Sequence, residues 1–498
     1  MELAFIWLLA GMAAIRVLVY CAAFPFFNNV DEQFHFDLVV KYSHGELPTK
    51  LVPFSQESAR YIILYGTPEY FAGPRRFPGR RIPPPTWTFP PTEIAREVPR
   101  ALEQWRSEPN HEALEPPLYY ALAALWLKLG SACGIGGGFL LYWIRFLNPL
   151  LAGALVWIGY VAARLVFPER SLIRLGVPVL LAFFPQDTFY SIQSDVLSPV
   201  LFGLAFIGVV KWLQTDAPGM RLALFTGLAL AASGLVKGAN WPLVAVATAT
   251  LLFHSVRRAW TGKLSGTLPA TALLLACIVL PLGGWLVRNV SLLGDISGTA
   301  EKTKSLGWTR KPVGEWWHHP ILTPKGLWEF WSELMASFWR GEFVWFGQRL
   351  SAPVMDNLYW FSSFVLLVLA APSLLPGLTS TTPSQRQVCR LAFACFAASV
   401  AFLALTSMAF DYGNCFYPSR AHPFFTSGRL ITGALVPFFL LYVHGLDRAL
   451  APVKVVWPGF LVLAGFVFFI TVSEIELNSP AFDSAYNWFG LWSGPSSG

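Results

Sequence analysis

Two adjacent carboxylates, Asp31 and Glu32, follow directly after the first hydrophobic run of the chain, residues 3–27. The end of a membrane helix is a costly place for two negative charges, and ionisable residues so placed indicate a functional site. Both side chains are expected to stay near water while they lie against an apolar wall. A carboxylate in this setting can act as a general base on a substrate that is carried by a lipid. The acidic pair is therefore the centre of a candidate active site.

Further polar residues lie at the ends of later hydrophobic runs. Asp195 separates two such runs, and Lys237 separates another two. Arg420 and Arg429 belong to a hydrophilic stretch near the end of the chain. If the intervening runs cross a membrane, all four residues emerge on the same side as Asp31. Cations on that side suit a phosphate group, and a carboxylate there can take the proton of an acceptor hydroxyl.

The elements that must position these groups are membrane helices. The chain of 498 residues is 54% hydrophobic and only 13% charged, whereas soluble domains are about 25% charged. A spanning helix needs about 20 mostly apolar residues, and about 11 runs meet or approach this length. They are residues 3–27, 139–166, 172–190, 196–213, 222–236, 241–253, 268–290, 358–375, 388–410, 430–443 and 455–472. We predict an all-α polytopic membrane protein with about 11 transmembrane helices and with interfacial helices in two long extracytoplasmic loops.

Positive charge in the short loops predicts the orientation, because short basic loops stay in the cytoplasm. The basic residues of these loops are Arg170, Arg174, Lys211, Arg221, Arg257, Arg258, Lys263, Arg386, Arg390, Arg448 and Lys454. Asp31 is then outside, provided that the apolar stretch 118–129 lies on the outer surface as an interfacial helix. A tilted span at 118–129 is the alternative, and it would move the basic loops outside. The outer segments are residues 28–115 and 291–357, whose Trp, Pro and Gly among charged residues indicate folded loops with short helices.

Several other classes have little support. The six cysteines show no spacing of a metal site or a disulfide framework. The net charge of +7 is spread over loops, so nothing indicates nucleic-acid binding. The first run has no basic segment before it and no small-residue cleavage site, so it is expected to be a retained span and not a signal peptide. The origin of the C-terminal tail, residues 493–498, is left open.

Several short motifs, taken in order, carry a family resemblance. An acidic pair after the first span is followed by Glu115-Pro116-Pro117-Leu118-Tyr119-Tyr120 and by Ser194-Asp195. In this the chain resembles the GT-C fold glycosyltransferases that use polyprenyl- or dolichyl-phosphate sugars, such as the protein mannosyltransferases and the lipid A aminoarabinose transferase. It is most similar to poorly characterised bacterial relatives. In these a Lys-containing loop, a Ser-Phe-Trp-Gly-type stretch and a Gly-Arg-Tyr-type helix start recur.

The matching stretches of this chain depart from that pattern in two places. They are Val236-Lys237-Gly238, Ser337-Phe338-Trp339-Arg340-Gly341 and Gly428-Arg429-Leu430. The second contains an additional Arg340, and the third has Leu430 where the family has Tyr. The resemblance covers residues 1–450.

The resemblance implies a mechanism in which an acceptor hydroxyl attacks the anomeric carbon of a lipid-phosphate sugar, usually with inversion. Asp31 matches the base, with Glu32 beside it, and Asp195 matches a second acidic residue that shapes the site. Lys237 and Arg429 are expected to bind the donor phosphate, because cations stabilise the negative charge that develops on a leaving phosphate. Weaker candidates for substrate binding follow from position alone: His35, Glu115, Tyr119 and Arg420.

The same resemblance implies partners, cofactors and location. The donor is a polyprenyl-phosphate-linked sugar, and the acceptor is an unknown glycan, lipid or protein. Some relatives use a divalent metal, but no ligand spacing is diagnostic here, so no metal ligand is assigned and a divalent cation is left open. The protein is expected in the bacterial cytoplasmic membrane with its site on the extracytoplasmic side. Residues 1–357 are expected to form the catalytic module and residues 358–498 a variable set of helices.

Simpler roles are open for each candidate. Asp31 and Asp195 can cap helix N-termini, Lys237 can extend its ammonium group to the surface, and Arg429 can anchor a helix at the interface. Glu115 can simply precede a helix that starts with proline.

Two other functions are also open. A transporter or flippase of lipid-linked sugars would need polar residues along a path through the membrane. The runs hold few charges near their middle beyond Arg16 and Arg145, and both are expected to pair internally. A glycan polymerase or ligase that uses polyprenyl diphosphate donors would also have a long outer loop, but the early acidic pair fits it less well.

Overall fold

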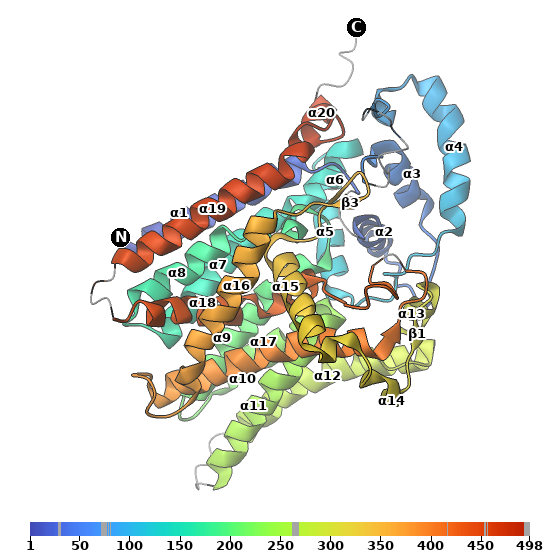
Figure 1. Ribbon diagram of the computed structural model, residues 1–498. Coiled ribbons are helices and arrows are strands. Elements are labelled where there is room, and N and C mark those ends of the chain that lie inside the picture. Colours follow the sequence, from blue (N-terminus) through green and yellow to red (C-terminus); the bar gives the residue numbers. More distant parts are fainter. Residues whose placement is uncertain are drawn as a thin grey trace.

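The computed structural model describes residues 1–27, 31–70, 77, 79, 81–260, 268–415, 417–452, 455 and 457–492 (Figure 1). Residues 28–30, Lys263, Lys454 and the tail 493–498, which the sequence analysis considered, lie outside these ranges. The described chain is mostly helical, with four strands of two residues each. Long helices lie side by side through the body of the molecule, and shorter helices gather at one end (Figure 1).

Nine helical segments of the described chain are long and apolar enough to cross a membrane. They are α1 (Glu2–Ala23), α6 (Gly137–Arg145) with α7 (Leu147–Val166), η4 (Ser194–Val196) with α9 (Ser198–Gln214), η5 (Gly238–Asn240) with α11 (Trp241–Trp260), α12 (Leu268–Leu293), α16 (Pro353–Ala370) with η7 (Ala371–Leu374), α17 (Pro383–Ala409), η8 (Gly428–Ala434) with α18 (Leu435–Ala449) and α19 (Trp457–Phe482). Two shorter apolar helices are α8 (Ser171–Ala182) and α10 (Met220–Val236). Every predicted run overlaps one of these segments, although α8 ends at Ala182, well before the end of run 172–190. The all-α polytopic architecture is confirmed.

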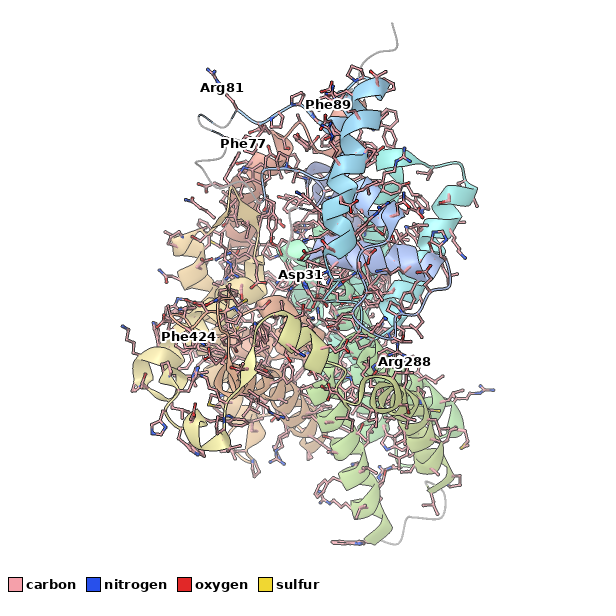
Figure 2. All side chains as sticks on the ribbon, turned by 90° about the vertical axis from the view of Figure 1, so that its right-hand side faces the viewer. Asp31, Phe77, Arg81, Phe89, Arg288 and Phe424 are labelled. Carbon is pink, nitrogen blue, oxygen red and sulfur yellow. The ribbon has the colours of Figure 1, made fainter. Side chains whose placement is uncertain are left out.

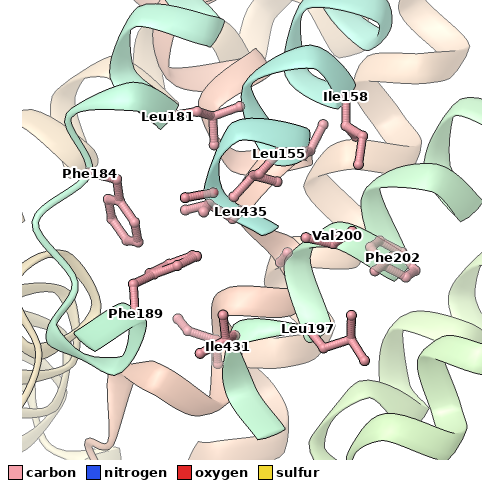
Figure 3. Packing of buried hydrophobic residues seen from close by; sticks show 14 of the residues in the cluster. Leu155, Ile158, Leu181, Phe184, Phe189, Leu197, Val200, Phe202, Ile431 and Leu435 are labelled. Carbon is pink, nitrogen blue, oxygen red and sulfur yellow. The ribbon is translucent and has the colours of Figure 1, made fainter. Parts of the chain in front are cut away.

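The centre of the bundle is α18, which packs against α16, α17 and α8. Its sequence is apolar on all sides, as expected for a helix that other helices surround. Gly445 allows α16 to approach closely, because a Cβ at this position would lie 2.0 Å from the carbonyl oxygen of Leu366. Leu155, Leu181 and Leu435 come from different helices and meet in this core (Figure 3).

The first outer segment folds into short helices, as predicted. They are α2 (Glu32–Ser43), α3 (Gln56–Tyr65), η2 (Thr86–Thr88) and α4 (Pro91–Ser107). The stretch 118–129 forms α5 (Leu118–Ala132), a helix of 15 residues that packs against α2 and α6. It is shorter than every candidate span, but its place at the membrane surface stays a prediction.

The second outer segment is also folded. It contains α13 (Ala300–Ser305), β1 (Thr309–Arg310), α14 (Val313–Trp316), η6 (Pro320–Leu322), α15 (Pro324–Arg340), β2 (Val344–Trp345) and β3 (Gln348–Arg349). β2 and β3 form a hairpin, and β1 pairs with β4 (Phe410–Asp411) from the end of α17. The remaining short helices are η3 (Asp187–Tyr190) and α20 (Trp488–Trp492).

Arg16 joins the first and last spans. Its guanidinium group pairs with Glu474 of α19 at 2.5 Å and also donates to the carbonyl oxygens of Ala182 and Phe184. The internal pairing expected for a charge inside an apolar run is therefore present.

Candidate functional site

A cavity of about 1510 Å³ lies between one end of the spans and residues of the segments 28–115 and 291–357. Asp31 lies near the middle of this end of the molecule, between Phe424 on one side and Arg288 on the other (Figure 2). The charged lining residues are Asp31, Glu112, Glu115, Lys237, Lys302, Glu333, Arg340, Glu342, Arg349, Asp356 and Arg429. Part of the lining is apolar: Trp241, Trp285, Leu286, Phe402 and Leu430. One cavity thus offers both charge and an apolar surface near the spans.

Asp31 is held at the cavity by Arg429 and His111. Its Oδ2 accepts a hydrogen bond from Arg429, and its Oδ1 lies 3.5 Å from Nε2 of His111. Burial alone would raise the pKa of Asp31, but Arg429 and His111 outweigh it and hold the pKa well below its usual range. Asp31 precedes α2 with a φ of 66°, and its side chain makes no capping bond. Helix capping, the simpler role, is therefore not what its carboxylate does.

Glu32 points away from the cavity, which corrects the expectation that both carboxylates stay near water. Its side chain is fully buried and forms a two-point ion pair with Arg145, at 2.7 and 2.6 Å. The backbone N–H groups of Phe27 and Ile192 donate to the same carboxylate. Successive residues of a helix point in different directions, so two neighbours in sequence meet different surroundings. In the structure Glu32 links α2 to α6.

Asp195 and Lys237 form a buried pair, with Nζ of Lys237 2.5 Å from Oδ2 of Asp195. Lys237 lines the cavity, whereas Asp195 lies behind it and is 2% exposed. Oδ1 of Asp195 has no hydrogen-bond partner among the described residues. Asp195 lies inside η4, and the N-cap residues of η4 and α9 are Gln193 and Leu197. Its main contact is therefore with the cation that faces the cavity.

Arg429 lies at the start of η8 and connects distant parts of the chain. Besides Asp31 it donates to Oε1 of Gln193 at 3.2 Å and to Oγ of Ser427 at 3.4 Å. Gln193 precedes Asp195 by two residues, so Arg429 brings the first acidic pair and the second acidic motif to one place. Arg429 comes from the predicted variable part, but it lines the same cavity as Asp31. The division of the chain at residue 357 stays a prediction.

A second charged cluster joins the two outer segments across the cavity. Lys302 of α13 donates to Glu112 at 2.7 Å and to Glu115 at 3.0 Å. Burial raises the pKa of Glu115. Burial also acts on Glu112, but Lys302 and His35 outweigh it and lower the pKa of Glu112. Glu115 thus lies at the cavity as expected, and its side chain contacts the second outer segment.

Three further candidates lie elsewhere. His35 is 1% exposed and its Nδ1 lies 2.7 Å from the hydroxyl of Tyr120, and burial lowers its pKa to about 4. Tyr119 is likewise buried, and burial raises its pKa. Arg420 is exposed, pairs with Asp411, and lines a separate cavity of about 610 Å³. In the described chain none of the three lines the large cavity, because their helices or loops turn them to other partners.

Sequence reasoning missed several charged residues of the cavity, among them Lys302, Glu342 and Arg349. All three lie in the second outer segment, where charged residues are scattered among Trp, Gly and Pro. Glu342 directly follows the Ser337–Gly341 motif, and this position is the one signal that pointed to it.

Two groups of side chains have an arrangement that suits a metal ion. Ligand atoms of Asp31, His111 and Glu112 lie within 4.8 Å of one another, and so do those of Glu329, Glu333 and His422. The first group includes the carboxylate at the centre of the cavity. Each group joins two residues that are near in sequence, His111 with Glu112 and Glu329 with Glu333, to a third from a distant part of the chain.

Gly341 lets a buried carboxylate approach the end of α15. Its φ is +89°, and a Cβ at this position would lie 1.9 Å from Oδ1 of Asp187. The other oxygen of Asp187 accepts the backbone N–H of Glu342 at 2.9 Å. Gly341 therefore sets the position of Glu342 in the cavity.

We expect Gly341→Ala to destabilise the protein by about 2–4 kcal/mol, because strain at positive φ adds to a steric clash. Gly377→Ala is the matched control, since Gly377 also has a positive φ but nothing within 4 Å of an added Cβ. It should cost only about 1 kcal/mol. Thermal unfolding of the purified proteins in detergent measures both effects. Equal melting temperatures for the two variants would contradict the role of Asp187.

Comparison with known proteins supplies the family. The family described as "Predicted membrane protein (DUF2142)" matches residues 15–414, which is most of the chain. The chain belongs to this family. Among curated proteins, none matches the chain.

Solved structures give a weaker likeness. The oligosaccharyltransferase of Archaeoglobus fulgidus in complex with zinc and sulfate is 11% identical over 95% of this chain and 52% of that chain, with a TM-score of 0.38. Its apo form is 11% identical over 97% and 56%, with a TM-score of 0.37. The archaeal oligosaccharyltransferase AglB from Archaeoglobus fulgidus with an inhibitory peptide and a dolichol-phosphate is 10% identical over 95% and 55%, at 0.38. The chain spans about half the length of these proteins, and at these TM-scores the likeness carries no argument about activity.

Proposed function

We propose that this member of the family is an integral membrane glycosyltransferase of GT-C type. It moves a sugar from a polyprenyl-phosphate donor to an acceptor hydroxyl on the extracytoplasmic face of the bacterial cytoplasmic membrane. One observation carries the proposal: Asp31, Lys237 and Arg429 are separated widely in sequence but line a single cavity. The acceptor is a glycan, a lipid or a protein.

In the proposed reaction the oxygen of the acceptor hydroxyl attacks the anomeric carbon of the donor sugar. The bond from that carbon to the phosphate oxygen breaks, and the prenyl phosphate leaves with the electron pair. The hydroxyl proton passes to the carboxylate of Asp31, which acts as general base. Lys237 and Arg429 stabilise the charge that develops on the leaving phosphate. Attack from the face opposite the leaving group inverts the anomeric carbon.

The remaining acidic candidates take supporting roles in this proposal. Asp195 positions Lys237 through their 2.5 Å contact. Glu32 holds α2 against α6 through Arg145, and so fixes the backbone that carries Asp31. Residues 1–357 form the catalytic module, to which η8 adds Arg429.

A divalent cation fits the donor set of Asp31, His111 and Glu112, since carboxylate oxygens and an imidazole nitrogen are suitable ligands. When bound there it would neutralise charge on the donor phosphate. Arg429 and Lys302 already contact two of these carboxylates. The steps above use only side chains of the chain itself.

A donor screen tests the proposed function. The purified protein in nanodiscs is incubated with radiolabelled polyprenyl monophosphate sugars, with their diphosphate counterparts and with envelope fractions as acceptors. We expect cleavage of the monophosphate donors together with labelled acceptor. Consumption of diphosphate donors alone would instead favour a polymerase or ligase. Movement of intact donor across liposomes without cleavage would favour a flippase.

A further inference from the structure

Arg349 is presented to the cavity by a strained hairpin. β2 and β3 are joined by Phe346 and Gly347, whose φ values are 48° and 69°. Positive φ is unfavourable for a bulky residue such as Phe346, and strain of this kind persists where the surroundings hold it. Here the backbone N–H of Phe346 donates to the carbonyl of Glu69 at 2.7 Å, and Leu350 donates to Phe343 at 2.9 Å. The hairpin therefore fixes Arg349 relative to both outer segments.

The guanidinium group of Arg349 is fixed on two sides and open on a third. It donates to Oε1 of Glu342 at 3.0 Å, and it lies over the ring of Tyr417 at 4.2 Å from the ring centroid. Its side chain is 30% exposed and lines the cavity. A guanidinium has five N–H donors, so donors remain beyond the one that Glu342 engages.

Glu342 aligns this arginine with a second one. Its Oε2 accepts a hydrogen bond from Ser427 at 2.8 Å and lies 3.7 Å from Nε of Arg429. Glu342 is 3% exposed, and Asp187 holds its backbone N–H. A single buried carboxylate thus contacts two guanidinium groups that line the same cavity.

Arg340 lines the cavity as well, but its situation differs. Its Nε and Nη2 bind both oxygens of Asp356, at 2.6 and 3.0 Å. The two-pronged edge that matches a carboxylate or phosphate is therefore already taken. Arg349 gives only one such bond to a carboxylate, so it is the better placed of the two to receive an anion.

We propose that Arg349 and Arg429, both positioned by Glu342, form the site that binds the phosphate of the lipid-linked donor. This inference rests on the proposed function and adds Arg349 as a phosphate ligand, Glu342 as a positioning residue and Tyr417 as the surface on which Arg349 lies. Two planar guanidinium groups bind phosphate oxygens with more geometric specificity than a single ammonium group. Arg349 faces the cavity, and Arg429 ties the same phosphate to the neighbourhood of Asp31.

Binding of three probes tests the site. The probes are a short-chain prenyl monophosphate, the corresponding prenyl alcohol and inorganic phosphate, and tryptophan fluorescence of the purified full chain reports each one. Arg349→Gln should weaken binding of the prenyl monophosphate about 10- to 100-fold, the value of one or two charged hydrogen bonds. Arg349→Lys should retain part of the affinity and Glu342→Gln should lose about 10-fold. Alcohol binding should not change, and displacement by inorganic phosphate should weaken in parallel.

Arg420→Gln is the matched control, because Arg420 is also an ion-paired arginine of the outer side but lies outside this cavity. Equal affinity of Arg349→Gln and Arg420→Gln for the prenyl monophosphate overturns the inference, as does a wild-type protein that binds alcohol and monophosphate equally. Melting temperatures identify any variant that has lost its fold. If Arg349→Gln is one of these, the affinity of Arg349→Lys for the prenyl monophosphate decides the outcome. Phosphate-dependent binding without sugar transfer would support the phosphate site but contradict the proposed function. Sugar transfer at an unchanged rate in Arg349→Gln would support the proposed function but contradict the phosphate site.

Discussion

Asp31→Asn is expected to lower the rate of sugar transfer by at least about 100-fold, the smaller part of the range that a general base contributes. Asparagine has nearly the same shape and can still accept the hydrogen bond of Arg429, so the protein should fold and insert. It cannot take a proton from the acceptor hydroxyl, and it no longer balances the charge of Arg429. Donor affinity should therefore change much less than the rate. Single-turnover transfer and donor binding, measured on the same preparation, separate the two effects.

The control for this variant is Asp411→Asn. Asp411 is also an outer carboxylate paired with an arginine, but it lies at the smaller cavity. It should transfer sugar at the wild-type rate. Full activity of Asp31→Asn with a lipid-linked donor would show that the base is another group. In that case Glu115, whose pKa burial raises and which lines the same cavity, becomes the next residue to test.

The lowered pKa of Asp31 adds an expectation about pH to the prediction for Asp31→Asn. Its folded-state pKa is depressed, so the stability from its ion pairs is fully present above the ordinary pKa of an aspartate. That stability is lost only as the pH falls through the lower folded value. Protonation of Asp31 should therefore not reduce activity at mildly acidic pH.

Glu32→Gln and Arg145→Met are each expected to destabilise the protein by about 3–5 kcal/mol. The first variant leaves the buried charge of Arg145 uncompensated, and the second does the same for Glu32. Both side chains of the pair are 0% exposed. Arg145 also donates to the carbonyl oxygens of Cys21, Phe24 and Pro25, so its loss exposes three further groups to an apolar environment. The variants should show low yield and a strongly reduced melting temperature in detergent.

The control for the buried pair is the surface pair of Arg170 and Asp447. Arg170 is 48% exposed, so Arg170→Met should cost no more than about 1 kcal/mol. A double variant Glu32→Gln with Arg145→Met should remain unstable, since the backbone groups that both side chains satisfy would stay unpaired. Normal stability of Glu32→Gln together with lost transfer would contradict the structural role. That result would instead indicate that Glu32 takes part in catalysis.

Asp31 and Glu32 show how far sequence reasoning reaches in the site. The acidic pair after the first span was recognised from position and charge, but the two residues are chemically alike and adjacent. Their different surroundings arise because α2 begins between them and turns Glu32 toward Arg145, whereas Asp31 meets Arg429. Nothing local to the pair distinguishes them. Lys237 and Asp195 were likewise both singled out, but their direct contact was not foreseen.

The membrane helices could be predicted from the chain alone, because the length of an apolar run reflects the thickness of a bilayer and needs no knowledge of distant residues. All runs from 3–27 to 455–472 overlap helices of the structure, although the helix in run 172–190 ends at Ala182. The partners of the charged residues could not be predicted in this way. Asp31 and Arg429 are 398 positions apart, and Glu32 and Arg145 are 113 apart. Which charges meet is decided when the helices pack, because each buried charge must find its counterpart there and cannot remain alone.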